Sequence, residues 1–299
     1  MDIHTTVRMW KLRRLQVLHI EPTDVCQAAC PLCARELDTT FNKHIKHHLQ
    51  IEHIQHHFSD RVLSKLNKMF MCGNYGDPAA GYYTMDIYNY FRKINPNITL
   101  GMNTNGAIQS TFWWNELGKL FNRPLDYCVF SIDGLESTNH VYRKNVNWEK
   151  LMSNAEAFIA AGGSAHWDML VYKHNQHQVD AAEHLARDMG FKWFRAKISK
   201  RAFTDRLEFP VGWQESVIKA GPIQCHAQQE KSMYIDAQGR ISACCWLGSR
   251  QKDFIADDLK TVKLSWRTNS PDPTCKSACS SDKNKTSFTN QWQREVQLC

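Results

Sequence analysis

The sequence predicts an α/β fold in which six βα units form a partial, TIM-like barrel, followed by a small C-terminal region built around a β-hairpin. Two observations support this prediction. Short apolar stretches of strand length alternate with amphipathic helical patterns from about residue 16 to residue 199. The chain has 299 residues, 42% of them hydrophobic and 22% charged, so it can bury a large core. Six units are fewer than the eight of a closed barrel, which favours an open one.

The predicted strands are rich in β-branched, aromatic or other apolar residues. They cover residues 16–20, 68–72, 98–102, 127–132, 166–172 and 192–198. One helical pattern lies in each of the five intervals between consecutive predicted strands. These cover residues 51–69, 86–94, 112–121, 148–161 and 179–189. In such folds the loops at the carboxyl ends of the strands carry the chemistry.

A charged stretch containing Pro210 and Gly212 marks the expected domain boundary. We therefore divide the chain into a barrel domain at residues 1–203 and a C-terminal domain at residues 204–299. Within the second, two short β patterns flank a polar turn that ends at Gly239, which predicts a β-hairpin.

The composition is unusual in its 11 cysteines and 14 histidines. The first 14 residues show no apolar signal segment, and no stretch approaches 18 consecutive apolar residues. We therefore expect a cytoplasmic protein without a membrane partner, in which clustered cysteines bind metal rather than form disulfides. The net charge of +7 permits an acidic partner without demanding one.

Three cysteines follow the first predicted strand with the spacing Cys-x3-Cys-x2-Cys: Cys26, Cys30 and Cys33. Three thiolates suit a [4Fe–4S] cluster and leave one of its four irons open to a small molecule. Structural zinc prefers four ligands, usually as two pairs. Three unrelated buried thiols are the remaining alternative.

The motif, preceded by Glu21-Pro22-Thr23 and set at the start of a six-fold βα pattern, resembles the radical S-adenosylmethionine (SAM) enzymes. The resemblance covers about residues 16–199. It implies that Cys26, Cys30 and Cys33 hold a [4Fe–4S] cluster whose open iron binds SAM. It further implies reductive cleavage of SAM to a 5′-deoxyadenosyl radical, which abstracts hydrogen from a substrate, and an electron donor such as flavodoxin or ferredoxin.

The same resemblance implies a set of SAM contacts at the ends of the second, third and fourth strands. They are Gly73, Gly76, Asp77, Asn103, Asn105, Ser131, Asp133 and Arg143. Residues 72–78 resemble the family's Gly-Gly-Glu-Pro segment, although Asp77 replaces the glutamate and two residues separate the glycines. An ordinary βα turn is the alternative for the glycines, and a solvated surface position is the alternative for Arg143.

The C-terminal cysteines resemble the SPASM or twitch extension of many radical SAM enzymes, in which a β-hairpin carries ligands of an auxiliary [4Fe–4S] cluster. The resemblance implies Cys225, Cys244, Cys275 and Cys279 as the four ligands. A full SPASM domain holds two clusters and needs more cysteines than this region has, so the shorter twitch is favoured.

Alternatives remain open for this ligand set. Cys245 could replace Cys244, and Cys299 could replace a later ligand. Adjacent residues of a strand point to opposite faces, so Cys244 and Cys245 are not expected to bind one cluster together. Four thiolates in paired loops also describe a zinc ribbon.

The predicted function is that of a radical SAM enzyme whose auxiliary cluster assists oxidation or binding of a peptide or a small polar metabolite. A tRNA or nucleotide substrate is the second hypothesis. The third is a zinc-stabilised nucleic-acid-binding protein without catalysis, so nucleic acid is a less favoured partner. His53 and His57 are spaced as a metal pair, but we expect them to lie on a solvent-facing helix side.

Overall fold

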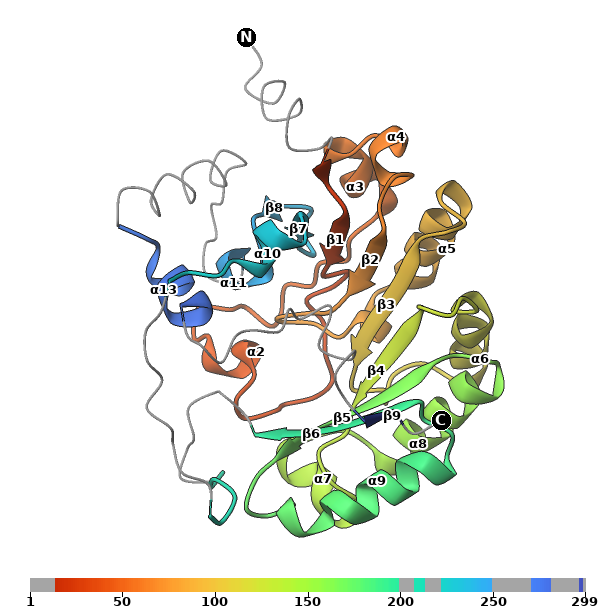
Figure 1. Ribbon diagram of the computed structural model, residues 1–299, viewed down its shortest axis with the longest axis vertical. Coiled ribbons are helices and arrows are strands. Elements are labelled where there is room, and N and C mark those ends of the chain that lie inside the picture. The colour runs from red at the N-terminus through yellow and green to blue at the C-terminus, as the bar shows by residue number, and fades with distance from the viewer. Residues whose placement is uncertain (1–13, 199–206, 213–221, 249–269, 281–295, 298–299) are drawn as a thin grey trace.

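A computed structural model of the chain describes residues 14–198, 207–212, 222–248, 270–280 and 296–297. One nine-stranded sheet runs through it in the order β8-β7-β1-β2-β3-β4-β5-β6-β9 (Figure 1). The strands are β1 (Val17–Ile20), β2 (Lys68–Met71), β3 (Thr99–Thr104), β4 (Tyr127–Ser131), β5 (Ala165–Val171), β6 (Trp193–Ile198), β7 (Ser232–Ile235), β8 (Ile241–Ser242) and β9 (Val296–Gln297). The neighbours from β7 through β6 are parallel, and the two edge strands β8 and β9 are antiparallel. The predicted α/β class and open, partial barrel are confirmed.

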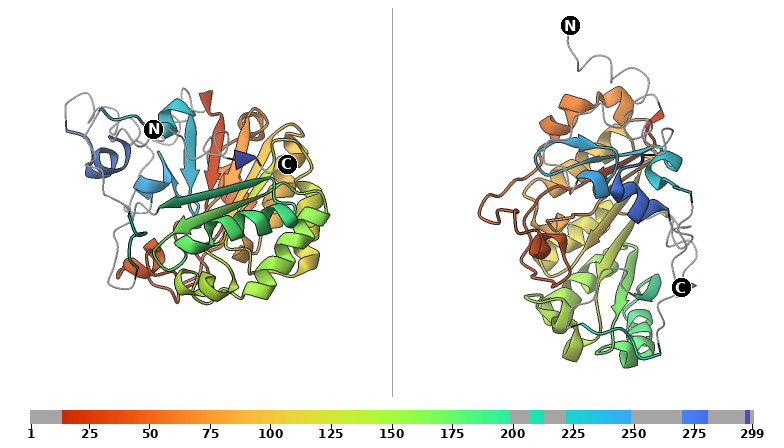
Figure 2. Two further views of the ribbon diagram at one scale, coloured as in Figure 1. Left: turned by 60° about the horizontal axis from the view of Figure 1, so that its bottom comes forward. Right: turned by 90° about the vertical axis from the view of Figure 1, so that its left-hand side faces the viewer.

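Helices connect the strands and cover one side of the curved sheet (Figures 1 and 2). The longer ones are α3 (Ile51–His57), α5 (Thr84–Ile94), α6 (Thr111–Leu120), α7 (Glu136–Tyr142), α8 (Trp148–Ala160) and α9 (Val179–Asp188). The others are α2 (Ala34–Leu37), α4 (Asp60–Leu63), η2 (Pro78–Ala80), η3 (Gln176–Gln178), α10 (His226–Gln229), α11 (Cys245–Gly248) and α13 (Pro273–Cys279). Side-chain caps fix several of these starts; for example, Ser110 accepts the backbone N–H of Trp113.

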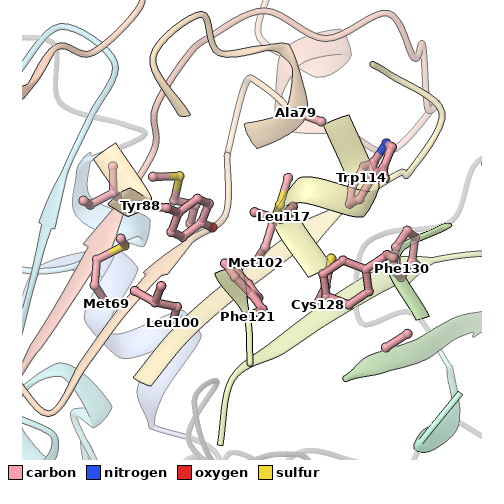
Figure 3. Close-up of a cluster of buried hydrophobic side chains, with 14 of the residues drawn as sticks. Met69, Ala79, Tyr88, Leu100, Met102, Trp114, Leu117, Phe121, Cys128 and Phe130 are labelled. Carbon is pink, nitrogen blue, oxygen red and sulfur yellow. The ribbon is translucent and has the colours of Figure 1, made fainter. Parts of the chain in front are cut away.

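The period of two along each strand separates a helix-covered face from an opposite, more polar face. The covered face supplies the main hydrophobic core, in which Leu100, Met102, Cys128 and Phe130 pack against Trp114 and other helix residues (Figure 3). Cys128 is fully buried there, as expected for a core thiol. The opposite face carries the polar residues that build the candidate site.

The C-terminal hairpin is confirmed, because β7 and β8 pair antiparallel around Gly239, whose φ is +79°. The hairpin is also part of the main sheet, since β7 pairs in parallel with β1. The sequence pattern could not foresee that pairing. The proposed division between residues 203 and 204 lies outside the described residues and stays a prediction.

Two local expectations are corrected. The helical pattern over residues 51–69 is broken at Ser59 into α3 and α4, and β2 begins at Lys68. His57 does not simply face solvent: it is half-buried, and its Nε2 lies 2.7 Å from the carbonyl oxygen of Gly239. This contact joins α3 to the hairpin turn. Throughout the described ranges, every helix is too short or too polar to cross a membrane.

Candidate functional site

The cysteine motif lies in the loop that leaves β1. Three backbone hydrogen bonds fix this loop: Asp77 N donates to Val25 O at 2.9 Å, Ala29 N to Lys144 O at 3.0 Å, and Cys33 N to Cys30 O at 3.0 Å. The first two tie it to the loop after β2 and to the segment after α7. Loops that follow β1, β2 and β4 therefore meet at one edge of the sheet, where the sequence placed the site.

The three thiols sit among polar groups that this edge supplies. Cys26 Sγ accepts the backbone N–H of Ala28 at 3.4 Å, and the amide nitrogen of Asn105 lies 3.6 Å from the same sulfur. Cys30 is buried, and Arg143 Nη1 lies 3.9 Å from its sulfur. Such N–H donors stabilise thiolates, which are the form that binds iron.

Burial, with smaller contributions from Asp77 and the thiols of Cys30 and Cys33, raises the pKa of Cys26 to about 12. The thiols of Cys30 and Cys33 therefore lie close enough to Cys26 to disfavour its ionisation, and a bound cation would reverse that effect. Within the described ranges, no three cysteine, histidine or acidic side chains converge as the ligands of a single metal ion do. A [4Fe–4S] cluster makes a different demand, because each thiolate binds its own iron. The three thiols fit that demand in residue type and surroundings.

Gly73 and Gly76 are needed because backbone segments approach each other closely. A Cβ on Gly76 would lie 1.9 Å from Thr23 O, and one on Gly73 would lie 1.9 Å from Gly76 O. Their φ values are not in the left-handed region. Gly73 thus lets the loop after β2 fold tightly on itself, and Gly76 lets that loop press against the one that leaves β1. Direct contact of either glycine with SAM stays a prediction.

Asp77 is almost fully buried and its carboxylate is occupied by the chain itself. It accepts Ala79 N at 2.9 Å, Thr104 Oγ1 at 2.7 Å and Asn105 N at 2.7 Å. Asp77 therefore fixes the ends of β2 and β3 relative to each other. A direct role in binding a ligand is not visible in these contacts.

Asn103, at the end of β3, is the best candidate for an outside partner. Its Oδ1 is buried and has no hydrogen-bond partner among the described residues. A buried acceptor without a donor costs free energy, so a ligand hydroxyl or amino group would satisfy it. Ser131 ends β4 and is half-buried. Asn105 instead forms a reciprocal amide pair with Gln27, at 2.8 and 3.2 Å.

Asp133 and Arg143 form a buried ion pair. Arg143 Nε donates to Asp133 Oδ2 at 2.6 Å, and Asp133 Oδ1 accepts Leu170 N at 2.6 Å. Arg143 is therefore not the solvated surface residue that was the alternative interpretation. Its Nη1 stays directed toward Cys30, where it can meet an anionic group.

In the sequence, Glu21 stands out only as part of the segment that precedes the cysteine motif, yet Glu21 organises the site. Its Oε1 accepts Tyr75 N at 2.7 Å and Gly76 N at 3.1 Å, and its Oε2 accepts the hydroxyl of Tyr234. Burial raises the pKa of Glu21 to about 7, although these hydrogen bonds oppose the shift. The one sequence signal for this role was the position of a charged residue directly after an apolar strand.

The auxiliary cysteines come from three separated segments. Cys225 precedes α10, Cys244 follows β8, and Cys275 and Cys279 lie on α13. Burial, together with the thiols of the other three, raises the pKa of Cys279 to about 12, so the four lie within electrostatic reach. Gln224 N donates to Cys279 O at 2.9 Å, which ties the segments together.

Cys245 faces a different neighbourhood from Cys244. Burial raises the pKa of Cys244 to about 11, with a contribution from Cys225. For Cys245, burial and Cys244 raise the pKa, and Cys72 and Glu21 add to the shift. Cys244 is thus the member of the adjacent pair that also faces the other auxiliary cysteines. Cys299 lies outside the described residues.

No protein-family model matches the chain, and neither does any curated protein. Solved structures do match. SuiB from Streptococcus suis, bound to the precursor peptide SuiA, aligns with a TM-score of 0.56 at 15% identity, covering 87% of this chain and 66% of SuiB. SuiB bound to S-adenosylmethionine aligns with a TM-score of 0.57 at 13% identity, covering 87% of this chain and 67% of that one. AnSMEcpe with bound AdoMet and Cp18Cys peptide aligns with a TM-score of 0.55 at 14% identity, covering 77% and 73%.

The chain thus spans about two thirds of the length of SuiB. At these identities the likeness concerns the fold. It agrees with the open βα sheet. The chain has the fold of the radical SAM enzymes.

Proposed function

We propose that this protein is a radical SAM enzyme that uses Cys26, Cys30 and Cys33 to hold a [4Fe–4S] cluster. One observation carries the proposal: in a chain with this fold, Cys26 lies beside Asn105 and Cys30 beside Arg143 at the carboxyl edge of the sheet, and Cys33 is within electrostatic reach of both thiols. When bound, the cluster supplies the electron that cleaves SAM.

The residues around the thiols would bind and orient SAM. Arg143, held at its Nε by Asp133, presents Nη1 beside Cys30, where it can pair with the SAM carboxylate. The unpartnered Oδ1 of Asn103 offers an acceptor to a ribose hydroxyl or the amino group. Glu21 and Asp77 act as positioning residues, because they fix the loops after β2 and β3.

The C-terminal region would bind an auxiliary [4Fe–4S] cluster through Cys225, Cys244, Cys275 and Cys279. Their mutual electrostatic proximity supports this assignment, as does the hairpin that precedes Cys244. We further propose the domain division at residues 203 and 204, and an electron donor such as flavodoxin or ferredoxin.

We propose a peptide as the substrate. The support is that structures with this fold were solved with peptides: SuiB with its precursor peptide and anSMEcpe with the Cp18Cys peptide. A small polar metabolite, and a tRNA or nucleotide, are the competing substrates. Substrate turnover with isotopically labelled peptide fragments would separate them.

The test of the first site is anaerobic purification with iron and sulfide analysis, followed by reduction in the presence of SAM. Two [4Fe–4S] clusters predict about eight irons per chain and formation of 5′-deoxyadenosine. The variant Cys30→Ala should lose about half of the iron and all cleavage. Stoichiometric zinc without visible absorbance would instead support the zinc-stabilised binding protein and end the proposal.

The adjacent cysteines give a matched test of the auxiliary site. Cys244→Ala should lose about four irons per chain, whereas Cys245→Ala should keep them. Both residues are half-buried, so the pair controls for the loss of a half-buried thiol. If the two variants lose iron equally, the assignment of Cys244 is wrong.

A further inference from the structure

A buried ion-pair cluster lies on the polar face of the sheet, on strands that the predicted SAM contacts do not use. Asp168 is on β5, and Arg195 and Lys197 are on the neighbouring β6 (Figure 1). Asp168 pairs in register with Arg195, and Leu170 with Lys197. Trp167, Met169 and Phe194 point to the opposite face and enter the hydrophobic core.

The contacts within this cluster are strong and directional. Arg195 donates from Nε to Asp168 Oδ1 at 2.9 Å and from Nη2 to Oδ2 at 2.8 Å, a bidentate geometry. Lys197 Nζ donates to Asp168 Oδ2 at 2.7 Å. Burial alone would raise the pKa of Asp168, but Lys197 and Arg195 hold it below its usual value.

Two cations on one carboxylate leave a net positive charge. The Arg195 and Asp168 side chains are only 6% and 13% exposed, whereas that of Lys197 is 38% exposed. Arg195 directs its fork at Asp168, so Lys197 is the cation with access to a ligand. An ammonium group has three donors, and the bond to Asp168 uses one of them. A charge held in such surroundings favours an anionic partner.

The ion-pair cluster lies next to the proposed SAM site. Leu170, two residues along β5 from Asp168, donates its backbone N–H to Asp133 at 2.6 Å. Asp133 in turn holds Arg143, which lies beside Cys30. Since Arg143 Nη1 lies 3.9 Å from Cys30 Sγ, it suits the SAM carboxylate, and Lys197 is available for a second anion.

We propose that Lys197, braced by Asp168 and Arg195, binds a carboxylate of the peptide substrate and so orients the peptide across β5 and β6. The carboxylate is that of an acidic side chain or of the peptide's C-terminus. This inference rests on the proposed function, because it takes the substrate to be a peptide that reaches the carboxyl edge of the sheet.

The test is calorimetric titration of the cluster-loaded protein, with saturating SAM, using three short probes. These are N-acetyl-Gly-Glu-Gly amide, the otherwise identical Gln peptide amide, and that Gln peptide with a free C-terminal carboxylate. At least one carboxylate peptide should bind about three- to tenfold tighter than the neutral one, because a charge-assisted bond forms at a partly exposed ammonium. The probe that gains affinity identifies the source of the carboxylate.

The preference should disappear in Lys197→Met, which leaves the Asp168–Arg195 pair in place. It should persist in the control Lys173→Met, which removes an exposed lysine paired with Glu208. Equal binding of the probes, including no binding of any, overturns the inference, as does a preference retained in Lys197→Met.

A preference for the carboxylate peptides that appears only without SAM would assign Lys197 to the SAM carboxylate. That result would also overturn the inference. Failure of the proposed function has a separate signature. The wild-type protein would then form no 5′-deoxyadenosine on reduction with SAM, whatever the peptide titration shows.

Discussion

The raised pKa of Glu21 predicts how the stability of the protein depends on pH. Its pKa is about 7 in the folded protein against 4.5 as an unperturbed side chain. The folded state therefore binds the proton more tightly, so this stabilising contribution is complete below the unfolded pKa and is lost as the pH rises through about 7. The variant Glu21→Gln keeps the shape of the protonated acid and cannot ionise.

The difference in unfolding free energy between Glu21→Gln and the wild type should widen by about 2 kcal/mol from about pH 5 to about pH 8, in favour of the variant. Parallel anaerobic denaturant titrations of the cluster-loaded proteins at several pH values would measure it. The control Glu208→Gln removes an exposed carboxylate and should show no such widening. A constant difference for Glu21→Gln across this range would refute the reasoning.

Two further variants test the contacts that hold the loops together. Gly76→Ala places a Cβ against Thr23 O, 1.9 Å away in the present geometry, and should cost about 2 kcal/mol of stability and reduce iron uptake on reconstitution. An unchanged melting temperature and iron content would contradict this. Asp133→Asn leaves Arg143 buried without its counter-charge and should lower the unfolding free energy by about 3 kcal/mol in the metal-free protein. If Asp133→Asn lowers the unfolding free energy no more than the loss of an exposed ion pair does, the Asp133–Arg143 pair is not needed for stability.

The sequence was sufficient for the strands, because each is a local apolar stretch whose period needs no distant partner. All six predicted strands are present, and the hairpin around Gly239 formed as its turn chemistry indicates. The break at Ser59 was not predictable from periodicity, since the apolar face continues across it.

What the sequence could not supply were contacts set by pairing between distant segments. Glu21 meets Tyr75 and Tyr234, which lie 54 and 213 residues further along the chain. The cluster of Asp168 with Arg195 exists only because the β5–β6 register places these two residues side by side. Each residue alone is an ordinary charged side chain in a strand.

The parallel pairing of β7 with β1 explains how two cysteine groups so far apart in sequence come to share one edge of the molecule. β1 leads into the cysteine loop, and β7 leads into the hairpin that ends at Cys244. The hydroxyl of Tyr234, on β7, reaches Glu21 at the exit of β1. Cys245 lies on that same side, within electrostatic reach of Glu21, whereas Cys244 also faces the remaining auxiliary cysteines. The Cys244–Cys245 peptide therefore links the surroundings of Glu21 to those of the remaining auxiliary cysteines. The hydrogen bond between Tyr234 and the buried Glu21 and the pairing of β7 with β1 hold these segments together. The barrel and the hairpin should therefore resist independent movement there.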